Sequence, residues 1–452
     1  MTETTPALFA MPASGGKPVI AAFDGGAQTS DIGVALLAAV ERRFGFIDRL
    51  AELVPDRRDP ARVTHRTGDM LRARVLAIAA GYEDVADLDA LRRDPAFLMA
   101  LGREPETGPG LCSKPTMHRL ENAPDKAAGR AMFRAMVDWF CMSFPSPPGT
   151  LTLDIDETPD AVHGGSQLAL FNGHYGVTCH LPIHIYHVET GRPVAVLLRP
   201  GKPPSGRELR AIMRVVMRRL RRAWPRTTVT WRGDGRYATP ETMGYLEAEG
   251  CGYLFGLPGN RRIDALFAAP ADALKAGRVE AAGTGGVLRD HAEARYAAAS
   301  WTDRRGGAIE RRVVARMEAS PHGYDVRYVV TNLPTPPAVL YDSLYCRRGE
   351  MENLIKLHKV QLASDRTSCV SPLANQFRLV LHTIAYWMMI ELRRLIAATR
   401  PERRASFDTI RLRLIKIAAR IEQMKTRIRV HLPSDHPAAG LFRSLSIRLA
   451  GP

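Results

Sequence analysis

The sequence has few cysteines, few aromatic residues and no long apolar run free of charge. Its six cysteines are scattered without a CxxC pair, which excludes a zinc ribbon and a disulfide-stapled scaffold and predicts unpaired, mostly buried thiols in a reducing cytoplasm. The most apolar helical stretch, 377–392, contains Arg378, His382 and Glu391 and is too short to span a bilayer, so we expect a buried core helix. The opening segment MTETTPALFAMPASGG lacks a basic region followed by an apolar run, so no secretion signal is expected.

Positive charge is what the chain has in excess. Lys and Arg number 63 against 47 Asp and Glu among 452 residues, which gives a formal net charge of +16 and an isoelectric point near 9.9. A field of this sign favours polyanionic partners, of which nucleic acid is the commonest, and the alternative is a basic surface kept for solubility. The length predicts a globular chain of about two to four domains.

The N-terminal part of the sequence predicts helices. Asp94 followed by Pro95 is typical of an N-cap with proline at the first helical position. A further helix is expected to begin near Asp125. The segment PSPPG at 145–149 then predicts the end of an α-helical N-terminal domain, 1–148.

The next part predicts an α/β domain. In TLTLDID, 150–156, the apolar residues alternate as in a strand. Further strands are expected at 181–188, 193–198, 228–232 and 252–257, and helices at 205–224 and 240–249. An antiparallel region followed by a βαβαβ order is compatible with a ribonuclease-H-like core.

The pattern changes between 260 and 342. Strands at 296–301, 309–317 and 324–331 are expected to form a three-stranded meander inserted into the α/β core. Helices resume near 346, and a last long helix is expected from Ser406 to Val430 because its apolar residues repeat at a/d spacing.

Five arginines form a stripe on the expected helix 205–224, opposite its apolar residues. They are Arg207, Arg210, Arg214, Arg218 and Arg221. The stripe could track a DNA backbone, and a solvated outer helix face is the alternative. Trp301, in the insertion, could stack on an unpaired base or could be a core aromatic residue of the meander.

Two expected strands end in acidic residues. TLTLDID ends in Asp154 and Asp156, and TVTWRGD ends in Asp234. The carboxyl ends of strands are the usual place for a site in an α/β sheet. Two such carboxylates and a third from a helix would bind two Mg²⁺ ions about 3.5–4 Å apart, which can activate water or a 3′-hydroxyl and stabilise the leaving oxygen. The alternative is a helix cap or a loop carboxylate.

A candidate third acid lies in YCRRGEMENLIKLHK. The residues Tyr345, Arg348, Glu352 and Lys359 are spaced three, four and seven apart, which puts them on one face of a helix. A carboxylate in such a stripe can bind metal while Arg348 and Lys359 hold DNA phosphates. The alternative is an ordinary surface helix with i, i+4 ion pairs. Glu350 is a weaker candidate because it falls off the stripe.

These four residues carry a resemblance to a known family. Their spacing reproduces the Y-R-E-K signature of the insertion-sequence-four-like DDE transposases, and the surrounding sequence resembles the insertion sequence thirteen-eighty family. The similar stretches include LDIDETPDAVHGGSQ, TGRPVAVLLRPG, WRGDGRYATPE, GYLFGLPGN, and ASDRTSC followed by ANQFRL. The likeness covers about residues 65–395.

The resemblance implies a set of site residues. The catalytic and metal-binding acids would be Asp156, Asp234 and Glu352, and the DNA contacts would be Tyr345, Arg348 and Lys359. Asp154 shares the strand face of Asp156 and remains a competitor for the role of first acid. The implied cofactor is Mg²⁺, for which Mn²⁺ can substitute.

The resemblance also implies an activity and its partners. A bacterial transposase would cut double-stranded DNA at terminal inverted repeats and join the freed ends to target DNA, as a homodimer in a synaptic complex, in the cytoplasm near the nucleoid and away from membranes. The alternatives are a DDE-type nuclease without strand transfer and a catalytically inactive DNA-binding relative.

The expected domain organisation follows. A helical region for DNA binding and dimerisation covers 1–148, a ribonuclease-H-like core lies in two parts at 149–259 and 343–400, a β-rich insertion covers 260–342, and a helical C-terminal region covers 401–452.

Overall fold

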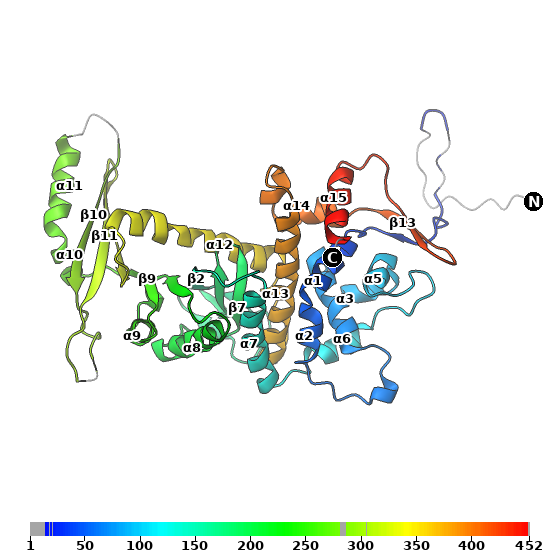
Figure 1. Cartoon of the computed structure of the whole chain (residues 1–452), viewed down its shortest axis with the longest axis horizontal. Helices are drawn as coiled ribbons and strands as arrows, with labels where there is room; N and C mark the ends of the chain where they lie inside the picture. Colours follow the sequence, from blue (N-terminus) through cyan, green and yellow to red (C-terminus); the bar gives the residue numbers. More distant parts are fainter. Residues whose placement is uncertain (1–13, 18, 20, 281–285, 304, 451–452) are drawn as a thin grey trace, which may run out of the picture. The chain divides into compact units, whose positions relative to one another are not determined.

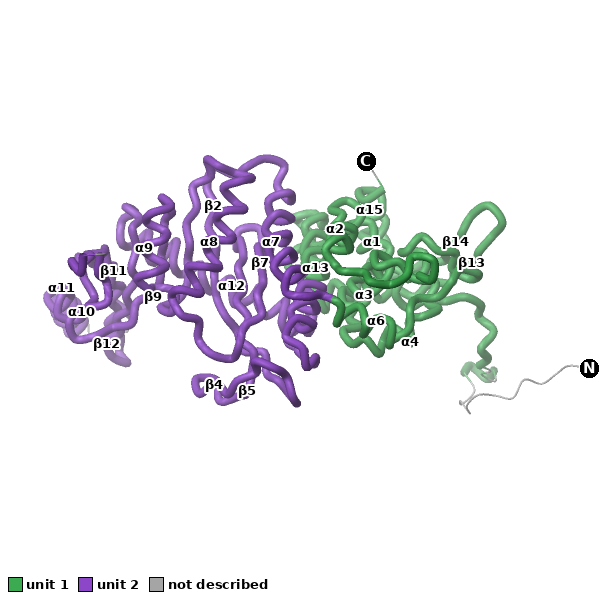
Figure 2. The backbone as a smooth tube through the Cα atoms, turned by 90° about the horizontal axis from the view of Figure 1, so that it is seen from below, with its two compact units in different colours: residues 1–123, 384–452 green, residues 124–383 purple. Residues whose placement is uncertain are grey.

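The computed structural model describes residues 14–17, 19, 21–280, 286–303 and 305–450. The chain divides into two compact units, which are coloured separately in Figure 2. Unit 1 comprises Met1–Ala123 and Ile384–Pro452, and unit 2 comprises Pro124–Thr383. Residues 1–13, most of the segment in which no secretion signal is expected, lie outside the described residues. No helix in the described part is long and apolar enough to cross a membrane.

Unit 1 consists mainly of helices. They are α1 (Val34–Phe44), α2 (Phe46–Ala51), α3 (Thr67–Ala80), α4 (Asp87–Ala90), α5 (Pro95–Ala100), α6 (Lys114–Glu121) and α15 (Ala439–Ala450). The expected N-cap is confirmed, because the Asp94 side chain accepts hydrogen bonds from the backbone N–H groups of Ala96 and Phe97. The helical character expected for the N-terminal region is therefore present in these residues.

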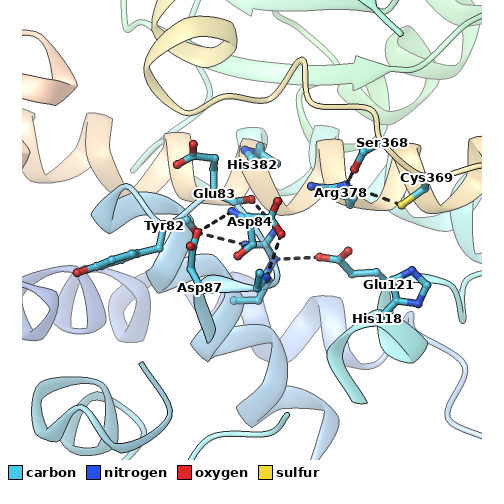
Figure 3. Close-up of polar contacts among 12 residues, drawn as sticks. Tyr82, Glu83, Asp84, Asp87, His118, Glu121, Ser368, Cys369, Arg378 and His382 are labelled. Atoms are coloured by element: carbon cyan, nitrogen blue, oxygen red, sulfur yellow. Dashed lines mark hydrogen bonds and ion pairs between the residues drawn. The ribbon is translucent and has the colours of Figure 1, made fainter. Parts of the chain in front are cut away.

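A buried ion pair joins α3 to α6 within unit 1. Arg74 Nε donates to Glu121 at 2.9 Å. The other guanidinium nitrogens donate to the carbonyl oxygens of Tyr82, Glu83 and Asp84, which are labelled around this contact in Figure 3. The carbonyls satisfy the remaining donors, so the buried cation has a complete set of partners.

The C-terminal segment corrects one expectation, since the helix predicted from Ser406 to Val430 is wrong. The chain forms α14 (Phe407–Ile410), a π-helical turn η8 (Arg411–Ile415) and two strands, β13 (Ala419–Gln423) and β14 (Ile428–His431). β13 pairs with β1 (Gln28–Thr29) from the other end of the sequence. Ile417, Ala419 and Ile421 are buried against Ile32 and Ala96. The apolar residues of this segment fit the two-residue period of a strand as well as the period of a helix. Pairing with the distant strand β1 selects the strand conformation.

Unit 2 is mixed α/β and contains an eight-stranded sheet. Its spatial order is β10 (Leu288–Tyr296), β11 (Arg311–Ser320), β12 (Gly323–Thr331), β9 (Gly252–Leu257), β8 (Thr228–Gly233), β2 (Thr150–Glu157), β6 (Ile183–His187) and β7 (Arg192–Leu197). β8 pairs in parallel with β2 and β9, and the other neighbours pair antiparallel. The strands expected between 150 and 257 are confirmed. A smaller sheet contains β3 (Asp160–Ala161), β5 (Val177–His180) and β4 (Leu170–Asn172).

Helices cover both faces of the large sheet (Figure 1). On one face lie α7 (Lys126–Met142), α8 (Gly206–Ala223) and α9 (Pro240–Ala248). Trp231 of β8 points to this side, because its indole N–H donates to the sulfur of Met217 on α8 at 3.4 Å. Leu254 of β9 points to the other side, where it packs against Leu340 and Tyr341.

The second face carries an irregular helical run, which we call the site segment, 339–361. It consists of η4 (Val339–Tyr345, π-helical), η5 (Cys346–Arg348, 3₁₀), α12 (Gly349–Lys356) and η6 (Leu357–Gln361, π-helical). The single regular helix assumed for the Y-R-E-K stripe is therefore wrong. The buried helix expected at 377–392 is confirmed within α13 (Pro372–Leu395).

The residues expected to form an inserted meander extend the large sheet at its edge, where β12 pairs with β9. The first strand lies at β10 and not at 296–301, and α10 (Arg261–Leu266) and α11 (Ala268–Glu280) precede it unexpectedly. β10 has charged side chains on both faces, so its alternation is weak. Trp301 is 2% exposed and contacts Tyr296 with ring centroids 5.4 Å apart, which confirms a core position.

Candidate active site

The acidic ends of β2 and β8 lie side by side. In the parallel pairing of these strands, Asp154 is opposite Arg232 and Ile155 is opposite Gly233. One residue further along each strand come Asp156 and Asp234. Because side chains alternate along a strand, Asp154 and Asp156 face the same side of the sheet, toward the site segment.

Asp154 is occupied by a buried arginine. Arg232 Nε and Nη2 donate to the two oxygens of Asp154 at 2.6 and 2.8 Å. Arg232 Nη1 also donates to the carbonyl oxygen of Leu344, so this pair attaches the sheet to the site segment. Burial raises the pKa of Asp154 to about 6, and Arg232 opposes that shift. The carboxylate of Asp154 therefore has a structural partner on both of its oxygens.

Asp156 faces the other candidate acids. Its Oδ2 accepts from Arg348 Nη2 at 2.7 Å, and its Oδ1 accepts from the backbone N–H of Glu157. Burial raises the pKa of Asp156, Arg348 opposes this, and the carboxylates of Asp234 and Glu352 add to it. The charges of Asp234 and Glu352 therefore act on the Asp156 carboxyl, and the assignment of the three acids as one catalytic set stays a prediction.

Asp234 directly follows β8 and caps the short helix η3 (Gly235–Tyr237), accepting from the backbone N–H of Arg236 at 2.9 Å. The side chain of Arg236 turns to Glu157 and donates to its Oε1. Burial raises the pKa of Glu157 to about 7 against the effect of Arg236, and Asp234 and Asp156 raise it further. Glu157 Oε2 is buried without a hydrogen-bond partner.

The sequence does not mark Glu157 or Arg236 as site residues. Their only sequence signal is proximity to Asp156 and Asp234 in the motifs DIDET and WRGDGRY. Their pairing depends on the register of β2 against β8, which the local sequence does not contain. The same register explains why Arg232 was not predicted as the partner of Asp154.

Glu352 lies on α12 and is the outermost of the acids. Its side chain is 69% exposed, and its Oε1 is 4.0 Å from Arg348 Nη1. Arg348 therefore lies between Asp156 and Glu352. The weaker candidate, Glu350, pairs with Arg347 at 3.4 Å.

Lys359 contacts the loop that follows β2, and Tyr345 lies against Gly256 of β9. A Cβ atom on Gly256 would be 2.6 Å from the Tyr345 hydroxyl oxygen and 3.1 Å from the backbone nitrogen of Gly235, so the Tyr345 hydroxyl lies close to the residue after Asp234. Lys359 Nζ donates to Thr158 Oγ1 and to the Pro159 carbonyl, just beyond Asp156. The four Y-R-E-K residues therefore make different contacts, because 3₁₀ and π turns change the angle between successive side chains.

The carboxylate oxygens at this site are of the kind that binds divalent cations. Within the described residues, no three His, Cys, Asp or Glu side chains are close enough together to hold a metal ion as they lie here. Nevertheless, hard carboxylate oxygens at two adjoining strand ends, together with the unpartnered oxygen of Glu157, are ligands that Mg²⁺ or Mn²⁺ prefers. Glu352 could join them by a side-chain rotation, for which its exposure leaves room.

A comparison with protein families identifies the class of protein that carries this arrangement. The family model described as transposase DDE domain group 1 matches residues 11–451. The chain belongs to this family. As a DDE transposase it is a metal-dependent DNA-cleaving enzyme.

Comparison with individual proteins adds two findings. No curated protein matches this transposase. Among solved structures, a cryo-EM structure of a piggyBac transposase synaptic complex with hairpin DNA is similar over 84% of this chain and 80% of its own, with 11% sequence identity and a TM-score of 0.43.

Proposed function

We propose that this transposase cuts DNA at the ends of its own element with Mg²⁺ and joins the freed ends to target DNA. Two observations support the proposal: Arg348 contacts both Asp156 and Glu352, and the charge of Asp234, directly after β8, acts on the same Asp156 carboxyl. A site at the carboxyl ends of adjoining strands is the usual position in an α/β sheet.

The strand order supports a ribonuclease-H-like core. Within the large sheet, β7, β6, β2, β8 and β9 are neighbours in that order, and β8 is parallel to β2 and β9. In this proposal the core is interrupted by α10, α11 and β10–β12 and resumes with the site segment. The resemblance to insertion-sequence-four-like transposases, closest to the insertion sequence thirteen-eighty family, agrees with this layout.

Each site residue has a proposed role. Asp156 and Asp234 hold the divalent cations, and Glu352 completes the ligand set. Asp154 is the less suitable first acid, because both of its oxygens are bonded to Arg232. Bound there, Mg²⁺ would activate water or a 3′-hydroxyl and stabilise the leaving oxygen.

The cations of the site position the acids and the DNA. Arg348 pairs with Asp156 and lies 4.0 Å from Glu352, and its guanidinium would also suit a DNA phosphate next to these acids. Lys359 fixes residues 158–160 after Asp156, and a phosphate contact remains a prediction for it. Tyr345 keeps the loop after Asp234 in position and is a further predicted DNA contact.

The proposed DNA partners are the terminal inverted repeats and a target duplex. Holding both ends of one element calls for two active sites, so a homodimer in a synaptic complex is the proposed assembly. A net charge of +16 favours binding of such polyanions.

The test is a cleavage and joining assay on a duplex carrying the repeat that flanks the reading frame. In Mg²⁺, the unmodified protein should release the flank and form products joined to a target plasmid, and EDTA should abolish both reactions. Glu352→Gln should cut at least 1,000-fold more slowly with binding unchanged, since it removes only the ligand charge.

Glu350→Gln is the matched control, because it removes the same charge from the same helix and should cut at the normal rate. Cut DNA without joined products would favour the alternative of a nuclease. Binding without cleavage by the unmodified protein would favour the inactive DNA-binding relative. Equal cleavage by both Gln variants would remove Glu352 from the site.

A further inference from the structure

Two neighbouring helices of unit 2 present rows of exposed cations. On α8 the exposed row consists of Arg207, Arg210, Arg214 and Arg218, and on α7 it consists of Lys126, Arg130 and Arg134. Residues spaced three or four apart lie on one side of a helix, so each set forms a row. We call these seven residues the α7–α8 basic face.

The charge of this face is not neutralised by the protein. In the part of the chain that the structure describes, none of the seven side chains has a hydrogen-bond or ion-pair partner. Two carboxylates on the same helices are engaged elsewhere, Asp138 with Arg219 and Glu208 with Arg199. Arginines without counter-ions repel one another, so a row of them is a suitable surface for an external polyanion.

The α7 row lines a cavity that α8 also borders. A cavity of about 470 Å³ lies between the helices, and its walls include Arg130 and Arg134 from α7 and Ala211 and Val215 from α8. The helices also pack against each other, since Arg219 of α8 pairs with Asp138 of α7. The α8 arginines Arg210 and Arg214 directly precede Ala211 and Val215 in the chain, so the two rows belong to packed, neighbouring helices.

The basic face begins near the candidate active site. A Cβ atom on Gly206 would collide with Thr239 and Glu241, so the start of α8 lies against the start of α9, the helix that follows Asp234 and η3 in the chain. At the other end of α8, Arg221 donates to the carbonyl of Thr227, directly before β8 begins. The row from Arg207 to Arg218 spans about 16 Å along the helix axis, or roughly five base pairs of a duplex.

We propose that the α7–α8 basic face binds the phosphate backbone of a DNA duplex without reading its sequence and holds DNA that extends away from the catalytic carboxylates. The inference rests on the proposed function in taking DNA as the polyanion. The arginine guanidinium donates two parallel hydrogen bonds to a phosphate, and such contacts fix position without specifying bases.

The test compares two variants of equal charge. Arg207, Arg210, Arg214 and Arg218 are changed to Gln in the first, and the exposed Arg261, Arg262, Arg295 and Arg305 are changed to Gln in the second. Each lowers the net charge from +16 to 16 − 4 = +12. Affinity for a random-sequence duplex is measured by fluorescence anisotropy at several salt concentrations, after thermal melting has shown that both variants fold.

The slope of log affinity against log salt should fall by about 3 to 4 in the α8 variant, since each lost phosphate contact removes about 0.9, and by less than about 1 in the control. A variant with Gln in place of Lys126, Arg130 and Arg134 should show a slope lower by about 2 to 3. Equal changes in the α8 variant and its control, or no change in either, would overturn the proposal, and an unchanged slope would point to an acidic protein as the partner of this face.

The experiments distinguish whether the α7–α8 basic face fails to bind DNA or the protein fails to cut it. At saturating protein, the α8 variant should still cut an element-end duplex at the normal rate, because its active site is intact. If the unmodified protein cuts no DNA while the salt slopes still differ as expected, the proposed function falls and the DNA surface stands.

Discussion

Helix α8 and the site segment lie on opposite faces of the same sheet, and the sequence predicts both as helices from residue spacing. α8 forms as expected, at Gly206–Ala223 against a predicted 205–224. The site segment, 339–361, instead alternates between π, 3₁₀ and α turns. The comparison separates a helix specified by its own residues from one shaped by distant contacts.

The determinants of α8 are local. Ser205 and Glu208 form a capping box at its start, and its apolar side is buried while the arginine side is exposed. The site segment is held at three points from outside. Arg232 donates to the carbonyl of Leu344, the Tyr345 hydroxyl lies against Gly256, and Lys359 donates to the carbonyl of Pro159. These contacts, and not the helical period, set the direction of its side chains.

The largest expected effect on stability follows from removing a support of the site segment. Arg232→Met should lower the free energy of unfolding by about 3–5 kcal/mol, because it leaves the charge of Asp154 buried without a partner. Arg219→Met on α8 is the matched control. Its pair with Asp138 is partly exposed, so about 1 kcal/mol or less is expected. Urea denaturation measures both, and equal losses would contradict the distinction between the two helices.

A smaller effect, on catalysis, is expected at Gly256. Gly256→Ala should slow element-end cleavage by about 100-fold, since the added Cβ would displace Tyr345 and the loop after Asp234 by a fraction of an ångström or more. Gly244→Ala, on α9, adds a Cβ into open space and should leave the rate unchanged. Single-turnover cleavage at saturating DNA measures both rates, and a normal rate for Gly256→Ala would mean that the contact does not position the site.

The cap of α8 should matter for stability alone. Ser205→Ala removes the capping hydrogen bond and should cost about 1 kcal/mol of unfolding free energy. The cleavage rate of the folded variant should remain normal, because α8 contributes none of the candidate acids. A cleavage defect larger than tenfold at saturating DNA would show that the start of α8 supports the site more directly than its hydrogen bonds indicate.

The smallest expected effect is a gain in stability within the site segment. Gly349→Ala should stabilise the protein by about 0.5–1 kcal/mol, because Gly349 begins α12 and a Cβ there meets no atom within 4 Å. Thermal unfolding measures the gain. A loss of stability would mean that the turn from 3₁₀ to α geometry at this position needs the freedom of glycine.

The elements of the core were predictable where local signals agree. The strands ending in Asp156 and Asp234 and the capped helix α8 have alternation, caps and amphipathic faces within a few residues. β10 and β13 were not predictable. One face of β10 is charged and the other carries Asp290 among apolar residues, and β13 takes its conformation from pairing with residues at the other end of the chain.

The sequence points to candidate acids for the site but contains no signal for its ion pairs. Strand ends and the Y-R-E-K spacing point to Asp156, Asp234 and Glu352. The partners Arg232 and Arg236 depend on the register between β2 and β8, which becomes known only when the sheet is formed. Cys112, Cys141, Cys179 and Cys251 are buried and all six cysteines are free, as the composition predicts.

The most direct test of the account is the number of divalent ions bound by the protein on an element-end duplex. Titration with Mn²⁺, followed by electron paramagnetic resonance, should show two ions per active site in the unmodified protein and in Glu350→Gln. Asp156→Asn, Asp234→Asn and Glu352→Gln should each weaken at least one ion by tenfold or more. Two ions bound with unchanged affinity in all three variants would contradict the assignment of these acids as the metal ligands.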